Sequence, residues 1–199
     1  MSCPPISLLA STRNMHKVRE IRAILGPSFR VFDLTVLAAT PEVEETGETF
    51  EDNATLKAVA LSQIYEGWVI ADDSGLEVDA LGGAPGVYSA RYSGKEATDI
   101  ENNALLLKNL EDVRGKDRKA RFRCVIALAR AGHKVAAFSG AVEGIIINRP
   151  KGAGGFGYDP LFVPRGFCKT FGQLPAATKN NLSHRAMALE RLREWDGWR

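Results

Sequence analysis

Residues 6–25, ISLLASTRNMHKVREIRAIL, decide the fold class of this 199-residue chain. The first five form a short apolar run, which predicts a buried strand. Residues 11–14 favour a helix start, and Val18, Ile21 and Leu25 then recur at helical spacing until Gly26. A strand that leads directly into an amphipathic helix is typical of α/β proteins, so we expect this class.

The rest of the chain continues the alternation of strands and helices. We expect further strands at residues 30–34, 68–71, 121–131 and 134–147, and helices at residues 50–66, 97–110 and 184–195. Residues 72–94 are rich in Gly and Ser and are expected to be mostly loop. The last two strands form a hairpin that turns at Gly132-His133, which favours a mixed sheet over a purely parallel one. No linker or repeat divides the chain, so residues 1–199 are expected to form a single domain.

The composition excludes several classes of protein. Twenty-six Lys and Arg against 24 Asp and Glu leave a net charge of +2, without the basic excess of a nucleic-acid or membrane-surface binder. No apolar run approaches the roughly 20 residues of a membrane span, and residues 1–10 do not resemble a secretory signal. Cys3, Cys124 and Cys168 form no CxxC pair, which disfavours a disulfide framework or a zinc site. A reduced cytoplasmic protein is expected, with Cys124 as a buried thiol.

Two acidic pairs are candidates for a metal site. Asp72 and Asp73 follow an apolar strand, where adjacent carboxylates are costly unless a cation is present, and Mg²⁺ is the natural cation. The alternative is a solvated turn. Glu44 and Glu45 alone would be surface charge, but together with the aspartates they would complete a carboxylate set for one or two divalent ions.

The junction at residues 11–17, STRNMHK, is a candidate anion site. Main-chain N–H groups at a helix N-terminus, small hydroxyls and Lys17 one turn into the helix all favour a bound anion. Ordinary helix capping with a surface lysine is the alternative. Lys57 lies beside the apolar stripe of the second helix, where it either extends to solvent or reaches a phosphate.

A glycine-rich stretch at residues 152–157, GAGGFG, formally matches a dinucleotide fingerprint. Pro160 stands where the helix of that motif should continue, and Lys179 occurs near the position of the acidic residue that would bind ribose. The remaining interpretation is a loop that presents Phe156, Tyr158 and Asp159 for stacking on a nucleobase and reading one of its edges.

The start of the last helix carries Ser183, His184 and Arg185. The histidine and arginine could donate hydrogen bonds to an oxygen acceptor or a phosphate. A hydrolytic triad built on Ser183 and His184 is disfavoured, because neighbours at a helix start are poorly placed for one.

Taken in order, these segments resemble the non-canonical purine nucleoside triphosphate pyrophosphatases, the Ham1-like family. The matching segments span nearly the whole chain and are residues 11–14 with Lys17, 44–47, 50–54 with Lys57, 71–76, 82–92, 154–160 and 183–185. The resemblance implies an elongated mixed sheet flanked by helices, with a substrate cleft between two lobes. It also implies a homodimer that requires Mg²⁺ and hydrolyses ITP, dITP and XTP to the monophosphate and pyrophosphate, which keeps these nucleotides out of DNA and RNA.

With this chemistry, each candidate residue receives a role. Asp73 would be the general base and a metal ligand, with Asp72, Glu45 and Glu44 completing the metal shell. Ser74 would hydrogen-bond the substrate. The phosphates would be held by Thr12, Arg13, Asn14, Met15, His16 and Lys17, with Lys57 in addition. The base would be held by Phe156, Gly157, Tyr158, Asp159, Lys179, His184 and Arg185.

Base selectivity has a physical reason. A 6-oxo purine presents an acceptor where adenine presents a donor, so a cationic donor such as His184 or Arg185 would favour the oxo group. A site that demands one hydrogen bond can discriminate by about 10⁴. The alternatives are a Maf-like pyrophosphatase acting on other bases, a non-catalytic nucleotide or RNA-binding module, and a phosphatase that releases orthophosphate.

Overall fold

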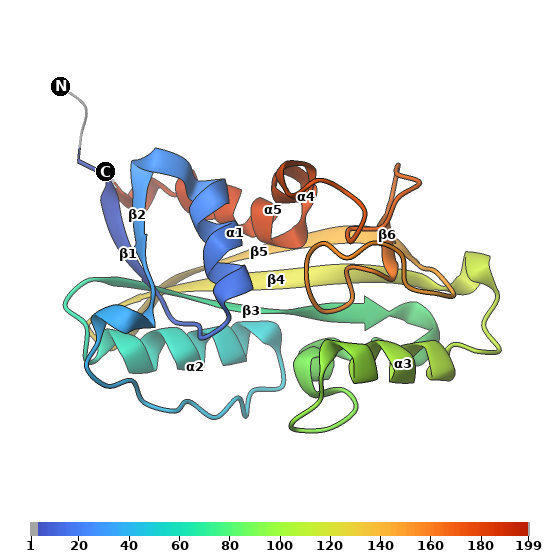
Figure 1. Ribbon diagram of the computed structural model, residues 1–199. Helices are drawn as coiled ribbons and strands as arrows, with labels where there is room; N and C mark the ends of the chain where they lie inside the picture. Colours follow the sequence, from blue (N-terminus) through green and yellow to red (C-terminus); the bar gives the residue numbers. More distant parts are fainter. Residues whose placement is uncertain (1–3, 199) are drawn as a thin grey trace. The chain divides into compact units, whose positions relative to one another are not determined.

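Within residues 4–198, which the computed structural model describes, the chain forms six strands and five α-helices (Figure 1). The strands are β1 (Ile6–Ala10), β2 (Phe29–Phe32), β3 (Trp68–Val78), β4 (Lys119–Arg130), β5 (His133–Ile146) and β6 (Phe162–Pro164). The helices are α1 (Met15–Leu25), α2 (Phe50–Ser62), α3 (Asp99–Asn109), α4 (Ala176–Leu182) and α5 (His184–Arg193). No helix in this part of the chain combines the length and apolar character needed to cross a membrane.

All six strands belong to one sheet, in the order β2-β1-β3-β4-β5-β6. Strand β1 runs parallel to β2 and to β3, whereas β5 and β6 are antiparallel. The predicted α/β class with a mixed sheet flanked by helices is therefore confirmed.

The described residues divide into two compact units. Unit 1 contains residues 4–73, 124–140 and 185–198, and unit 2 contains residues 74–123 and 141–184. Strands β3, β4 and β5 each contribute residues to both units.

Strand alternation builds the core of unit 1. Leu8 and Ile70 pack with residues of α1 and α5, whereas Leu9 and Val69 pack with Leu61 of α2. Because successive side chains of a strand point to opposite faces, one helix covers one face and two helices cover the other. Figure 1 shows this arrangement, with α2 on one side of the strands of unit 1 and α1 and α5 on the other.

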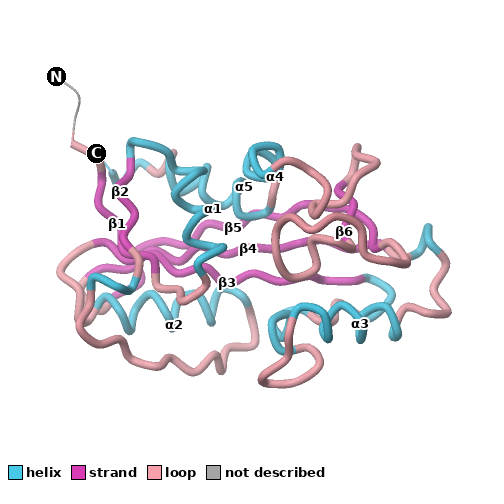
Figure 2. The backbone as a smooth tube through the Cα atoms, viewed as in Figure 1, coloured by secondary structure: helices cyan, strands magenta, loops and turns pink. Residues whose placement is uncertain are grey.

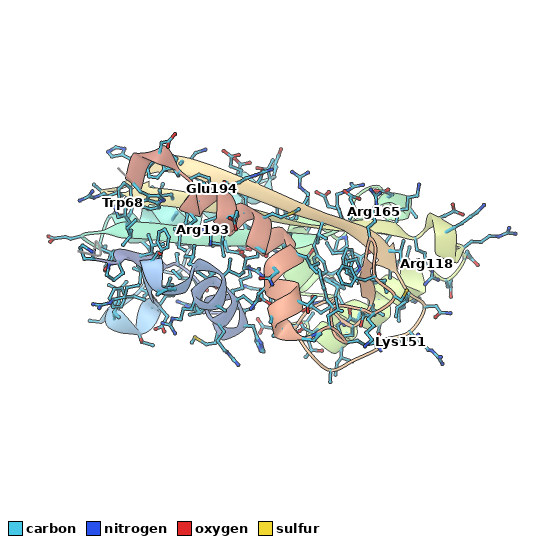
Figure 3. All side chains as sticks on the ribbon, turned by 90° about the horizontal axis from the view of Figure 1, so that it is seen from above. Trp68, Arg118, Lys151, Arg165, Arg193 and Glu194 are labelled. Atoms are coloured by element: carbon cyan, nitrogen blue, oxygen red, sulfur yellow. The ribbon has the colours of Figure 1, made fainter. Side chains whose placement is uncertain are left out.

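Three tryptophans of unit 1 pack against one another. The ring of Trp68 lies 6.0 Å from that of Trp195 and 5.4 Å from that of Trp198, both in edge-to-face geometry. Figure 3 shows Trp68 at the same end of this unit as Arg193, the last residue of α5. Aromatic pairs in this geometry contribute about 0.5–1.5 kcal/mol beyond their buried area, so they hold the C-terminal residues on the sheet.

Unit 2 has a separate core around α3, β4 and the chain after β5. Leu106 of α3 and Phe122 of β4 pack with Tyr158, Leu161 and other buried side chains. Figure 2 shows that the chain between β5 and α4 is mostly loop apart from the short β6. Burial of Tyr158 and Leu161 anchors this loop.

The structure corrects the predicted extent of β3. The prediction ended this strand at residue 71 and assigned residues 72–94 mostly to loop, but β3 continues to Val78. Leu76 and Val78 are fully buried, and the carboxylates of Asp72 and Asp73 are neutralised by nearby cations. A strand can therefore continue through two adjacent aspartates.

Other boundaries also differ from the predictions. Strand β2 ends at Phe32, because Asp33 caps a following 3₁₀ turn through the N–H of Thr35. The hairpin turns at Ala131 and Gly132, whose φ angles of 51° and 78° match the positive values that a two-residue turn favours. Strand β6 and helix α4 were not predicted, since segments of three and seven residues carry little periodic signal.

Candidate active site

Each unit contains a buried cluster of polar or charged side chains. The carboxylate cluster of unit 1 consists of Lys17, Glu20, Glu45, Lys57, Asp72, Asp73 and Arg185. The aromatic cluster of unit 2 consists of Phe122, Phe156, Asp159, Phe171, Lys179 and His184.

Strand β3 separates the two aspartates of the carboxylate cluster. Asp72 follows the alternation of Ile70 and meets Lys17 of α1 and Arg185 of α5. Asp73 meets Lys57 of α2. The carboxylates therefore face opposite sides of the strand, and the predicted acidic pair does not converge on one point.

On the α2 side, the ammonium of Lys57 is surrounded by three oxygens. Its Nζ donates to Glu45 Oε1 at 2.8 Å, to Asp73 Oδ1 at 2.7 Å and to the main-chain oxygen of Asp72 at 3.0 Å. The prediction left open whether Lys57 extends to solvent or reaches a phosphate, and in this structure it forms ion pairs instead. Glu44, predicted as a further metal ligand, is exposed.

Burial sets the protonation behaviour on this side. Loss of hydration raises the pKa of Asp73 above its ordinary value, and attraction to Lys57 only partly offsets this effect. Burial opposes the charge of Lys57, but Asp73 and Glu45 outweigh it and raise the pKa of the ammonium. The site therefore joins a carboxyl of raised pKa to a lysine of raised pKa.

On the other side, Asp72 is the centre of a buried network. Arg185 donates from Nε to Asp72 Oδ2 at 2.8 Å and from Nη2 to Oδ1 at 3.3 Å, and Lys17 also pairs with Oδ1. Burial opposes ionisation of Asp72, but Arg185 and Lys17 outweigh it and hold the pKa of the carboxyl well below its ordinary value. Asp72 is thus a carboxylate bound to cations of this chain.

Two residues of this network have no predicted site role. Glu20 pairs with Nη1 of Arg185, and Cys124 donates from Sγ to Asp72 Oδ2 at 3.1 Å. Glu20 lies three residues after Lys17 in α1, so the two side chains are neighbours on the helix surface. This spacing was the signal in the sequence that could have identified Glu20. Cys124 is a buried thiol, as predicted, and burial raises its pKa well above the ordinary value.

The carboxylate cluster fits the ligand chemistry of Mg²⁺. Among residues 4–198, no three His, Cys, Asp or Glu side chains converge to hold a metal ion. Mg²⁺ is usually bound through one or two carboxylates, with water and substrate phosphates completing its shell. Asp73 and Glu45 supply two such carboxylates around one cation, whereas Asp72 is already engaged by Arg185 and Lys17.

The predicted phosphate-binding segment forms the start of α1. Asn14 caps the helix, and its Oδ1 accepts from the N–H groups of His16 and Lys17. Oγ1 of Thr12 accepts from the N–H of Asn14 at 3.1 Å. The structure therefore contains the helix capping weighed as the alternative, while Arg13, Met15 and His16 have exposed side chains.

In unit 2, Asp159 and Lys179 organise the predicted base-binding loop. Lys179 Nζ lies 2.5 Å from Asp159 Oδ2, which also accepts from the N–H of Phe156 at 2.8 Å. The same ammonium lies 4.8 Å from the ring centroid of Phe156 and 5.7 Å from that of Phe171, within cation–π range. The ring of Phe156 is therefore held in place by its own loop.

Helix α3 also holds the base-binding loop in place. These contacts were not predicted from the sequence. Asp99 accepts from the N–H of Gly157 at 2.6 Å, and Asn103 donates to the oxygen of Gly157 at 3.0 Å. The hydroxyl of Tyr158 donates to the main-chain oxygen of Ser89 at 2.8 Å, and burial raises its pKa. Tyr158 thus anchors the loop from a buried position.

Two predicted base-binding residues at the start of α5, His184 and Arg185, belong to different units. His184 is buried in unit 2 and stacks on Phe122, with ring centroids 4.9 Å apart and an interplanar angle of 13°. Arg185 belongs to unit 1, where it is fully buried against Asp72 and Glu20. Ser74, which follows Asp73 in β3, is half-buried in unit 2.

The sequence and the structure are similar to those of known proteins. The chain is 49% identical over 186 residues to a dITP/XTP pyrophosphatase of Bacillus licheniformis, covering 93% of this chain and 95% of the relative. It is 51% identical over 192 residues to a dITP/XTP pyrophosphatase of Geobacter sulfurreducens, covering 96% of each.

Solved structures of Ham1 proteins are also similar to this chain. The Ham1 protein of Staphylococcus aureus has a TM-score of 0.83 at 40% identity, with 94% of this chain and 96% of that chain covered. A HAM1 protein of Coxiella burnetii has a TM-score of 0.84 at 38% identity, with the same shares covered. The sequence model of the Ham1 family matches residues 8–195. This protein therefore belongs to the Ham1 family.

Proposed function

We propose that this protein is a nucleoside triphosphate pyrophosphohydrolase that converts dITP, ITP and XTP to the monophosphate and pyrophosphate. The observation that carries the proposal is the identity of about one half, over nearly the whole chain, with proteins named dITP/XTP pyrophosphatase. The proposed role is to remove deaminated purine nucleotides before they enter DNA and RNA.

Asp73 is the proposed general base. A buried carboxylate with a raised pKa accepts a proton from water more readily than an exposed one. The water would attack the α phosphorus, and pyrophosphate would leave. Lys57 lies 2.7 Å from Asp73 and is the cation proposed to orient a phosphate.

Asp73 and Glu45 are the proposed ligands of Mg²⁺. When bound, the ion would offset charge on the phosphates and lower the pKa of bound water. Asp72 is omitted from this set, because Arg185 and Lys17 already neutralise it. We assign it the positioning of Lys17, which with residues 12–16 is the proposed phosphate-binding segment.

The aromatic cluster is the proposed binding site for the base. The ring of Phe156 offers a stacking surface, and Lys179 and His184 offer donors for the 6-oxo group. Adenine presents an amino group at this position and would leave such a donor unpaired. A direct contact from Arg185 to the base would require the guanidinium to exchange a carboxylate partner.

Three further parts of the proposal rest on the family resemblance and the cysteine usage. The protein is proposed to act in the cytoplasm, as a homodimer, and with both units in one domain. Analytical ultracentrifugation tests the homodimer, and thermal unfolding followed by tryptophan fluorescence and circular dichroism tests the single domain.

A product assay tests the function. Pyrophosphate and orthophosphate release is measured with dITP, ITP, XTP, GTP, ATP, dTTP and UTP, with Mg²⁺ and with excess EDTA. Pyrophosphate release from dITP, ITP and XTP that stops in EDTA is the expected result. Turnover of dTTP and UTP would instead favour the Maf-like alternative, and orthophosphate would favour a phosphatase. Nucleotide binding without any product would identify a binding module.

A further inference from the structure

The three oxygens around Lys57 form a cation site that a lysine already fills. Two of them belong to carboxylates and the third to a main-chain carbonyl, which are hard oxygen donors of the kind that bind divalent cations. An ammonium has three N–H donors, and here each has one oxygen partner. Lys57 therefore has no N–H left for a substrate phosphate in this arrangement.

The backbone of Lys57 is fixed, but its charged end can move. Oγ of Ser11 donates to the main-chain oxygen of Lys57 at 3.1 Å, which ties this turn of α2 to the end of β1. The side chain is mostly buried, yet its four-carbon stem has several rotatable bonds. The ammonium can thus leave the three oxygens while the helix stays in place.

Charge opposes the presence of two cations at this site. Asp73 and Glu45 carry two negative charges and Lys57 one positive charge, so the group has a net charge of −1. A divalent ion would neutralise the two carboxylates in the absence of Lys57. With Lys57 retained, two cations would lie within a few ångströms of each other in a buried site.

From these contacts we propose that Lys57 occupies the position of the divalent cation in the resting protein and is displaced by it. The inference rests on the proposed function and adds an exchange of cations to it. Once displaced, the ammonium is free to donate to a phosphate of the substrate. Metal binding and phosphate binding are then coupled, because the oxygens that accept the metal are those that release the lysine.

The exchange also requires a contraction of the site. Oxygens now 2.7–3.0 Å from Nζ would approach to the 2.0–2.1 Å of a Mg²⁺ ligand, a movement of about 0.6–1.0 Å. Glu45 lies in the loop before α2 and can follow this movement more easily than Asp73 in β3. The residue expected to shift most is therefore Glu45.

Direct metal binding tests the exchange. Lys57→Met removes the ammonium and retains a side chain of similar length. Binding of Mn²⁺ to the full chain without nucleotide is measured by electron paramagnetic resonance. We expect Lys57→Met to bind Mn²⁺ at least about tenfold more tightly than the unmodified protein, because a competing charge is removed from the ligands. Unchanged or weaker binding would overturn the exchange.

Two control variants separate local exchange from general electrostatics. Lys57→Arg keeps the positive charge and should bind Mn²⁺ as weakly as the unmodified protein. Lys17→Met removes a neighbouring half-buried cation that pairs with Asp72 instead. An equal gain in affinity from Lys17→Met and Lys57→Met would also overturn the exchange. If Lys57→Met fails to fold, as judged by circular dichroism, Lys57→Gln takes its place, since its amide is uncharged but still donates hydrogen bonds.

Turnover of dITP by the unmodified protein is measured on the same preparation. Turnover together with no gain of Mn²⁺ affinity in Lys57→Met overturns the exchange and leaves the proposed function. Tighter Mn²⁺ binding in that variant without turnover by the unmodified protein supports the exchange and overturns the proposed function.

Discussion

Asp72 and Asp73 are neighbours in β3, yet their carboxylates bind cations on opposite faces of the strand. Asp72 meets Arg185 and Lys17, whereas Asp73 meets Lys57. The partners of Asp72 hold its pKa well below the ordinary value, while burial raises the pKa of Asp73. One strand thus separates a carboxyl whose pKa is lowered by folding from one whose pKa is raised, and the first two predictions follow from this difference.

Asp73→Asn should remove catalysis while retaining the fold. An amide of similar size cannot accept a proton from water, so kcat for dITP should fall by about 10²- to 10⁴-fold. Nucleotide binding should persist, since the base cluster is unchanged. Pyrophosphate release and calorimetric nucleotide binding measure the two effects. The exposed variant Asp112→Asn is the control, and a rate near that of the unmodified protein in Asp73→Asn would remove this residue from the mechanism.

Asp72→Asn should mainly destabilise the protein. It leaves Glu20 as the one remaining carboxylate partner of the fully buried guanidinium of Arg185 among the described residues, and breaking a buried pair costs about 3–5 kcal/mol. Urea unfolding at pH 7, followed by tryptophan fluorescence, measures the change in the free energy of unfolding. Asp112→Asn should unfold like the unmodified protein.

The loss of stability caused by Asp72→Asn should become smaller as the pH falls. The pKa of the Asp72 carboxyl is lower in the folded protein than in the unfolded chain, where it is near 3.8. Such a group contributes its full stabilisation at pH values above the pKa of the unfolded chain. The difference in stability between the unmodified protein and Asp72→Asn should be constant above that pH. It should narrow as the pH falls from 3.8 toward and through the depressed value. A difference that stays the same in acid would contradict the assigned role of the Asp72 charge.

Phe156→Leu should weaken binding of the base and leave the chemistry nearly intact. Stacking of a base on an aromatic ring contributes about 1–3 kcal/mol, so KM for dITP should rise by roughly 5- to 160-fold with little change in kcat. Inhibition by pyrophosphate, which has no base, should stay unchanged. Phe167→Leu is the matched control, because Phe167 is a partly exposed phenylalanine of unit 2 outside the aromatic cluster. Equal KM values for both variants would exclude stacking on Phe156.

Thermal unfolding should show whether the two units behave as one domain. The three tryptophans of the chain, Trp68, Trp195 and Trp198, all lie in unit 1. Their fluorescence reports on that unit, while far-UV circular dichroism reports on both. Because β3, β4 and β5 contribute residues to both units, we expect the two transitions to coincide. Midpoints several degrees apart would contradict the single-domain proposal.

Local patterns predicted most of the regular structure. The spacing of apolar residues in residues 6–25 identified β1 and α1. Thr49 caps α2 at its predicted start, whereas Thr98 caps α3 so that this helix begins two residues after its predicted start at residue 97. These signals succeed because capping and periodicity involve residues within one turn or one strand. Strand β6 and helix α4 escaped, because segments this short depend on the surfaces against which they pack.

The sequence by itself determined most of the helices and strands, the mixed sheet and the ordered motifs that revealed the family. Only the tertiary structure decided which cation each carboxylate meets. Arg185 is 113 residues from Asp72 in the chain, and Lys57 is 16 residues from Asp73. Strand alternation and the placement of α1 and α5 against one face and α2 against the other choose these pairs. A pattern of adjacent aspartates has no such information, because long-range pairing and burial arise only when the chain is folded.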